Sequence, residues 1–191
     1  IVVENKSPMN ESTMKDAKQV KMICQLSTGY DNVDIEYCKN RGIHVANARN
    51  YSTAAVAQHT VALALSVLEN LPYYDNYVKS GAYASQPRFA HFKPWYELEG
   101  KTWGIAGMGN IGRRVAKAAE ALGCKVIFFA TSGHSDCRDY EQVDWDTLLA
   151  QSDILSLHCP LSDRTFHLMN ADAFSKMKKS AVLINVARGA V

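Results

Sequence analysis

The chain has 191 residues, of which 47% are hydrophobic and 21% charged, proportions that are typical of a globular protein with a buried core. Its formal net charge of +2 is too small for the basic field that nucleic-acid binding requires. No apolar run reaches the ~18 residues of a membrane-spanning helix. We therefore expect a cytoplasmic protein whose partners are neither nucleic acids nor membranes.

Cysteine usage favours a reducing compartment. The five cysteines are odd in number and none of them forms a CxxC pair. A disulfide framework needs paired cysteines, and a zinc site usually takes two ligands from one turn. We therefore expect reduced thiols and no metal.

Strand and helix patterns alternate over residues 1–50. Apolar runs predict strands at 1–4, 22–26 and 43–47, and helices are expected over about 11–18 and 33–40. Asn10 is a suitable cap for the first helix, and Gly42 is a typical stop for the second. This alternation predicts a parallel sheet. Because a strand begins at Ile1 and Val191 follows shortly after another, we expect a fragment of a longer chain.

The middle of the chain has a different character. Residues 52–68 are small or apolar on almost every side, which predicts a long, deeply buried helix with Ser52 as its N-cap. The helical pattern resumes over 73–79 after an interruption at Pro72. Residues 81–100 are rich in aromatic side chains and irregular, so we expect a loop that packs on another surface, such as a partner subunit.

Residues 101–191 repeat a strand and helix pattern. Strands are expected at 101–106, 125–129, 153–158 and 181–186, with helices over 111–122, 144–151 and 170–177. The expected fold class is α/β, with a doubly wound parallel sheet.

The strongest local motif is the GxGxxG sequence Gly107-Met108-Gly109-Asn110-Ile111-Gly112, which follows a predicted strand and opens a predicted helix. In such a turn the first glycine permits the tight bend, the second lets a pyrophosphate approach, and the third lets the helix pack against the strand. The amide groups at the start of the helix favour the phosphate charge. The motif predicts a dinucleotide site that includes Asn110 and Ile111, whereas a glycine turn without a ligand is the alternative.

The usual acidic residue at the end of the second strand is missing. NAD-binding sites carry Asp or Glu about 20 residues after the glycines, to hold the ribose hydroxyls, but Ala130 occupies that position here. Thr131, Ser132 and the nearby Arg138 are suited to a 2′-phosphate, which favours NADP over NAD. The alternatives are that these hydroxyls bind the ribose of NAD directly, or that Asp136 restores the usual preference.

Several segments together resemble the D-isomer-specific 2-hydroxyacid dehydrogenases. They run through most of the chain in the order found in that family, and the set is far more specific than any single motif. The matching segments are residues 28–34, 51–53, 56–60, 100–112, 152–154, 158–161, 177–178 and 183–189.

The resemblance implies an architecture in which a dinucleotide domain is inserted into a substrate domain. Residues 1–50 are then part of a flavodoxin-like substrate domain, and residues 51–100 form the connecting helix and aromatic loop. Residues 101–191 are a Rossmann-type NAD(P)-binding domain that is incomplete at its C-terminal end. Family members also imply a homodimer, in which the helix at 52–68 and the aromatic stretch would be buried.

The resemblance also assigns roles to individual residues. Arg188 is similar to the catalytic arginine, whose guanidinium clamps the substrate carboxylate and polarises the keto oxygen, although by itself it could merely cap a strand end. Gly29 and Tyr30 resemble the loop that receives the substrate carboxylate, and an ordinary turn is the alternative. The resemblance assigns Thr60, Pro160 and Thr165 to the cofactor, and an ordinary loop after a strand is the alternative for Pro160 and Thr165. Val186 is also assigned to the cofactor, and His158 is expected to be structural or to line the cofactor. A buried threonine that bonds its own helix is the alternative for Thr60.

None of the six histidines matches the general acid/base of the family. That histidine and its assisting glutamate are expected beyond Val191, so neither His59 nor His158 is assigned as catalytic.

The expected function is hydride transfer between NAD(P)H and a small 2-keto acid, giving the D-2-hydroxy acid. The Tyr51-Ser52-Thr53 context and the loop from Phe89 to Phe92 most resemble glycerate dehydrogenases, also called hydroxypyruvate reductases. A lactate-type enzyme is the near alternative. Two further alternatives are a dinucleotide-sensing co-repressor and a formate dehydrogenase, both of which have the same fold.

Overall fold

The computed structural model describes residues 1–4, 6–85 and 93–191, and the chain divides into two compact units, Ile1–Thr53 and Ala54–Val191. Each unit is described by itself below. The aromatic residues Phe89, His91 and Phe92 lie outside the described residues.

The first unit is built on a small parallel sheet. Strands β1 (Val2–Val3), β2 (Met22–Gln25) and β3 (His44–Asn47) pair in the order β1-β2-β3. Helices α1 (Glu11–Met14) and α2 (Ile35–Asn40) connect them. Helix α1 begins with a capping box between Asn10 and Thr13 but ends earlier than predicted, at Met14. A cluster of buried side chains closes this unit: Met9, Met14, Ile23, Val33, Cys38 and Ile43.

The second unit contains a five-stranded, entirely parallel sheet. Its strands are β4 (Thr102–Ala106), β5 (Lys125–Phe129), β6 (Glu141–Gln142), β7 (Ile154–Leu157) and β8 (Val182–Asn185). They pair in the order β6-β5-β4-β7-β8, so the chain moves outward from β4 in one direction and then in the other. This is the order of a doubly wound dinucleotide-binding fold, with its topological switch point between β4 and β7, and the predicted fold class is confirmed.

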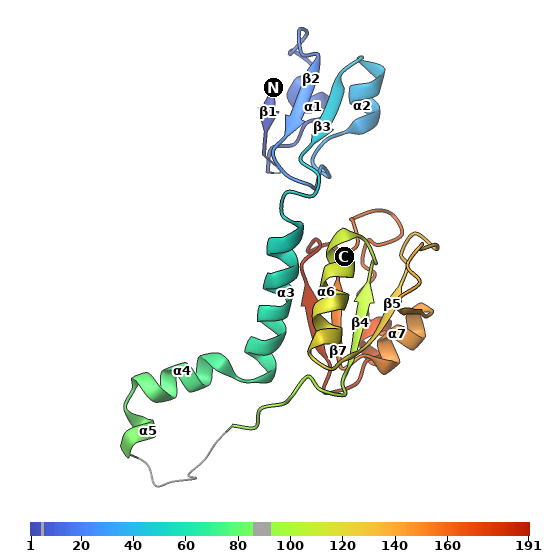
Figure 1. The fold of residues 1–191 in the computed structure, drawn as a ribbon. Coiled ribbons are helices and arrows are strands. Elements are labelled where there is room, and N and C mark those ends of the chain that lie inside the picture. Colours follow the sequence, from blue (N-terminus) through green and yellow to red (C-terminus); the bar gives the residue numbers. More distant parts are fainter. Residues whose placement is uncertain (5, 86–92) are drawn as a thin grey trace. The chain divides into compact units, whose positions relative to one another are not determined.

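Alternating side chains of the central strands build a core on each face of this sheet, whose strands and helices are drawn as ribbons in Figure 1. Trp103, Ile105 and Phe128 belong to one cluster, which also takes in side chains of α6 (Asn110–Ala121). Ala106 and Ile127 belong to the other, together with residues of α7 (Trp145–Gln151) and α8 (Ala171–Lys176). Both faces are therefore covered, which is why these strands are apolar almost throughout.

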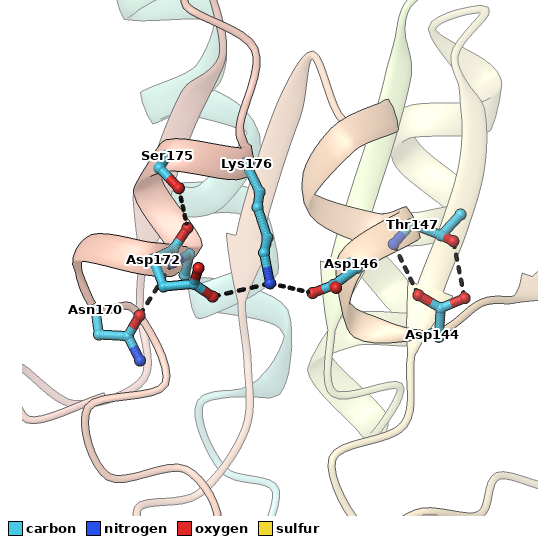
Figure 2. Close-up of polar contacts among 8 residues, drawn as sticks. Asp144, Asp146, Thr147, Asn170, Asp172, Ser175 and Lys176 are labelled. Carbon is cyan, nitrogen blue, oxygen red and sulfur yellow. Dashed lines mark hydrogen bonds and ion pairs between the residues drawn. The ribbon is translucent and has the colours of Figure 1, made fainter.

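Polar contacts cap the start of α7 and connect α7 with α8 (Figure 2). The side chain of Asp144 accepts hydrogen bonds from the amide and hydroxyl groups of Thr147, each at 2.8 Å. Lys176 lies between two carboxylates, 2.9 Å from that of Asp146 on α7 and 2.8 Å from that of Asp172 on α8. The ammonium group thereby links the two helices.

Helix α3 (Thr53–Leu68) is less buried than its sequence predicts. A single stripe is buried, formed by Ala57, Thr60, Ala64 and Leu68, whereas other apolar side chains such as Val67 are exposed. The prediction of a deeply buried helix is wrong for this chain, because the residues that the structure describes cover one side of α3 and leave the rest exposed. Helices α4 (Leu71–Lys79) and α5 (Ala82–Ser85) follow, and α5 falls in the stretch that was expected to be irregular.

In the part of the chain that the structure describes, no single helix is long and apolar enough to cross a membrane. Helices α3 and α4 reach the necessary length and composition only as a pair, and they meet at a bend of 64°.

Candidate cofactor site

A cavity of about 490 Å³ opens where the central strands of the second unit end. Its lining comes from the segments after β4, β5 and β7, which meet because parallel strands have their carboxyl ends at one edge of the sheet. The lining residues are Gly107, Met108, Gly109, Ala130, Thr131, Ser132, His134, Ser135, Asp136, His158, Cys159, Pro160, Ser162, Arg164 and Thr165.

The glycine motif has the geometry that its spacing predicts. Gly107 has a φ of +98°, and a Cβ there would lie 3.0 Å from the backbone nitrogen of Cys159. A Cβ on Gly112 would lie 2.4 Å from the carbonyl oxygen of Gly107, so α6 packs directly on the turn. A Cβ on Gly109 would meet no atom of the described residues within 4 Å. Gly107 and Gly112 are therefore required by the protein itself, whereas the space at Gly109 is open to a ligand.

The start of α6 is suited to an anion. Gly109 is the N-cap residue and provides no side-chain hydrogen bond to the amide groups of the first turn. Such groups carry partial positive charge from the helix dipole, and they commonly bind phosphate. The open space at Gly109 and these amide groups together fit the pyrophosphate of a dinucleotide.

A compact loop after β7 forms the opposite wall. The buried hydroxyl of Thr165 donates to the carbonyl oxygen of Pro160 at 2.6 Å and accepts from the amide of Ser162 at 2.8 Å. Pro160 and Thr165 thus lie in the cavity wall, where the hydroxyl of Thr165 stabilises the loop. Their contact with the cofactor stays a prediction.

A chain of hydrogen bonds runs from the sheet to His158. The indole Nε1 of Trp103 donates to Oγ of Ser156 at 2.9 Å, and the same oxygen is 2.9 Å from Nε2 of His158. Burial lowers the pKa of His158 to about 4, because desolvation disfavours the imidazolium form. At neutral pH His158 is therefore an uncharged wall of the cavity, which suits cofactor lining rather than proton transfer.

The end of the cavity beyond β5 is polar and carries charges of both signs. Ala130 is buried at the position of the usual acidic residue, followed in the lining by Thr131 and Ser132. The cation that lines this end is Arg164, which donates to the backbone oxygen of Ser132 at 3.4 Å. Sequence reasoning expected Arg138 in this role, but Arg138 is exposed and lies outside the lining. Arg164 lies between Pro160 and Thr165, which were both predicted to bind the cofactor, and this position in the sequence could have identified it.

Arg188 and Val186 follow strand β8 at the same edge of the sheet. The side chain of Asn185 shapes this turn, because it accepts from the amide of Ala187 and donates to the carbonyl oxygen of Arg188, each at 2.9 Å. One guanidinium nitrogen of Arg188 donates to the carbonyl oxygen of Ala187 at 2.9 Å. Sequence reasoning missed Asn185. Arg188 and Val186 lie outside the cavity lining, so their roles stay predictions.

Four other residues that were predicted to bind the cofactor lie outside the cavity lining. Asn110, Ile111 and Gly112 form the first turn of α6. Thr60 on α3 is buried, and its hydroxyl donates to the carbonyl oxygen of Val56 at 2.8 Å. That bond is the alternative weighed for Thr60, and its assignment to the cofactor stays a prediction.

Gly29 and Tyr30 belong to the first unit. The carbonyl oxygen of Gly29 accepts from the hydroxyl of Ser27 at 2.7 Å, and Asn47 donates to the carbonyl oxygen of Thr28 at 2.7 Å. The loop after β2 is thereby tied to the end of β3. Tyr30 is exposed at one side of a second cavity, of about 480 Å³, within this unit. The assignment of both residues to the substrate stays a prediction.

Comparison with known proteins agrees with this geometry. Residues 61–191 match the model of the D-isomer specific 2-hydroxyacid dehydrogenase NAD-binding domain. Over 99% of its length the chain is 40% identical to a glycerate dehydrogenase of Methylorubrum extorquens, of which it covers 59%. It superposes over its whole length, with a TM-score of 0.89 and 34% identity, on a D-lactate dehydrogenase of Aquifex aeolicus complexed with NAD and lactic acid, and covers 56% of that chain.

A second similar structure is an acyclic imino acid reductase in complex with NADPH and D-Arg. It matches 99% of the chain with a TM-score of 0.88 and 32% identity, and the chain covers 60% of it. The chain thus spans somewhat more than half the length of these relatives.

Proposed function

The chain belongs to the D-isomer-specific 2-hydroxyacid dehydrogenase family, and we propose that the whole protein interconverts a small 2-keto acid and its D-2-hydroxy acid with a nicotinamide dinucleotide. The observation that carries the proposal is the cavity at the switch point of the sheet, together with the space beside Gly109 at the start of α6, where Gly109 provides no side-chain cap. The dinucleotide supplies or accepts the hydride, and the protein binds and orients it.

Arg188 is the proposed catalytic residue. A guanidinium presents two parallel N–H donors, so it can hold the substrate carboxylate and polarise the keto oxygen as negative charge develops there. The side chain of Asn185 bonds to the backbone of Ala187 and Arg188 and so stabilises the turn that carries Arg188. In the same scheme Gly29 and Tyr30 receive the substrate carboxylate, residues 1–50 are part of the substrate domain, residues 51–100 are the connector, and residues 101–191 are the cofactor domain.

Hydroxypyruvate and D-glycerate are the favoured substrate pair. The support is the resemblance at residues 51–53 and the relative of 40% identity named glycerate dehydrogenase. The name of the Aquifex aeolicus structure makes pyruvate and D-lactate the comparison pair. The names of these relatives do not favour the alternatives of a co-repressor or a formate dehydrogenase.

NADPH is the slightly favoured cofactor. Ala130 leaves the end of β5 without a carboxylate, and the hydroxyls of Thr131 and Ser132 line the cavity beside Arg164. A 2′-phosphate needs such donors and a guanidinium. Binding of NADH remains part of the proposal, because Asp136 also lines this end.

A homodimer in the cytoplasm is the proposed state of the whole protein. Exposed apolar side chains on α3 and α4, namely Val67, Leu71 and Val78, are of the kind that a subunit interface covers. The unpaired state of all five cysteines supports a reducing compartment. Sedimentation of the whole protein at micromolar concentration should give a dimer, and a monomer would contradict this part of the proposal.

The activity is tested by following the oxidation of NADPH and of NADH by the whole protein with hydroxypyruvate, glyoxylate and pyruvate in turn. We expect turnover with hydroxypyruvate, a D-configured product, and a fall in kcat/KM of about 10²–10³ in Arg188→Gln. Arg188→Lys keeps the charge but loses the planar pair of donors, so it should restore little activity. Binding of cofactor without turnover of any 2-keto acid would overturn the proposed activity.

A further inference from the structure

An ion pair stands at the mouth of the cavity beyond β5. The guanidinium of Arg113, in the first turns of α6, contacts the carboxylate of Asp136, in the segment that follows β5. Asp136 is one of the residues that line the cavity. Its side chain is 89% exposed, and that of Arg113 is 33% exposed, so the pair is accessible to an incoming ligand and can be broken by one.

The neighbours of this pair would otherwise form an anion site. Ala130 contributes no charge, Thr131 and Ser132 contribute hydroxyls, and Arg164 contributes a guanidinium that is bound to the neutral backbone oxygen of Ser132. Within this end of the lining, Asp136 is the carboxylate that opposes the charge of a phosphate. It also neutralises Arg113, a second guanidinium, which lies outside the lining and contacts it through Asp136.

We propose that Asp136, through its ion pair with Arg113, sets the choice between NADH and NADPH at this site, an inference that rests on the proposed dinucleotide function. In the paired state the Asp136 carboxylate can still accept hydrogen bonds from ribose hydroxyls. At the usual acidic position, Ala130 has no carboxylate that could do so. Binding of NADPH must instead break the pair, so that Arg113 and Arg164 face the 2′-phosphate. The pair thereby keeps NADH acceptable and limits the preference for NADPH.

The size of the effect follows from exposure. Charges in water are screened, so an exposed pair is worth far less than a buried one, but an arginine released onto a phosphate makes a charge-assisted, bidentate contact. We expect removal of the Asp136 charge to change the ratio of the two dissociation constants by about tenfold, or about 1.4 kcal/mol. The change should shrink as salt concentration rises.

The test compares Asp136→Asn with Asp139→Asn in the whole protein. Asp139 lies in the same segment, is exposed, and is outside the cavity lining, so its substitution reports the change in net charge alone. Fluorescence titration with NADPH and NADH should give tighter NADPH binding and equal or weaker NADH binding for Asp136→Asn. Asp139→Asn should leave the ratio within about twofold of the parent value, because an exposed charge outside the cavity is screened by solvent and salt.

The double variant Asp136→Asn/Arg113→Gln separates the two residues. If Asp136 acts by holding Arg113, most of the gain in NADPH affinity disappears when Arg113 is also replaced, and only the part that comes from removing a carboxylate beside the phosphate persists. A gain of undiminished size without Arg113, or a ratio unchanged in Asp136→Asn, would overturn the inference while leaving the dinucleotide site in place. Failure of the parent protein to bind either dinucleotide would instead overturn the proposed function.

Discussion

Gly109 and Gly112, both at the start of α6, should respond differently to substitution by alanine. The change at Gly112 should lower stability, and the change at Gly109 should weaken dinucleotide binding. At Gly112 the added Cβ would lie 2.4 Å from the backbone oxygen of Gly107 and 3.2 Å from a methyl carbon of Ile105. Overpacking of this kind costs about 1–3 kcal/mol, and the better helix propensity of alanine offsets up to about 1 kcal/mol. We expect Gly112→Ala to lose about 1–2 kcal/mol of unfolding free energy, and to displace the turn.

At Gly109 the added Cβ meets nothing within 4 Å among residues 1–4, 6–85 and 93–191, and the φ of −81° is accessible to alanine. Alanine is a poorer N-cap residue than glycine but restricts the unfolded chain, and these effects of roughly 0.5–1 kcal/mol oppose each other. Stability should therefore stay close to that of the parent protein. The methyl group would instead occupy the space proposed for the pyrophosphate, so the dissociation constant for NADH should rise at least about tenfold.

Thermal denaturation and NADH fluorescence titration on the same preparations test this pair of variants. A loss of 1 kcal/mol lowers Tm by about 2–4 °C for a protein of 150–250 residues, so Gly112→Ala should melt several degrees below Gly109→Ala. Parent-like NADH affinity in Gly109→Ala would refute the proposed path of the pyrophosphate. Equal loss of Tm in both variants would refute the distinction between a packed glycine and an open one.

Three further substitutions test the sheet that carries the site. Gly104→Ala places a Cβ 1.9 Å from Oγ of Ser152 and should lower the unfolding free energy, measured by urea denaturation, by about 1–3 kcal/mol. Adding Ser152→Ala should restore part of that stability, and no restoration would contradict the contact. Trp103→Phe removes the donor to Ser156 and should cost about 1–3 kcal/mol, whereas an unchanged urea midpoint would mean that the bond is unimportant. Since the pKa of His158 is lowered from 6.5 to about 4 in the fold, the unfolded state binds the proton first, and stability should fall as pH drops from 6.5 towards 4. His158→Gln should flatten that part of the pH profile, and an equal slope in the variant would assign it to other groups.

The second unit was largely predictable because its signals are local. Gly107, Gly109 and Gly112 lie within six residues, so their spacing alone predicts the turn, and the apolar runs predict four of the five strands in sequence order. Strand β6 was missed because it has two exposed polar residues, Glu141 and Gln142, and exists only by pairing with β5. The early end of α1 at Met14 was missed for a related reason, since the polar residues that follow it are compatible with either a helix or a turn.

The composition of the cavity wall was less predictable. Ala130 could be identified by counting from the glycines, but Arg164 reaches the same end of the cavity from a loop more than thirty residues later in the chain. Arg138, which is nearer in sequence, lies outside the wall. Nearness in sequence is a poor guide here, because the sheet brings together the ends of strands that are far apart along the chain.

What the sequence by itself determined is the class of fold, the position of the glycine turn and the absence of an acidic residue at position 130. These follow from side-chain periodicity and from residues that act within one turn of backbone. Only the tertiary structure decided that Asp136 meets Arg113, that Trp103 and Ser156 fix His158, and that α3 is buried on one side alone. Each of these depends on which segments the parallel sheet places next to each other, and hydrogen bonds, ion pairs and burial depend on distance in space and not on distance along the chain.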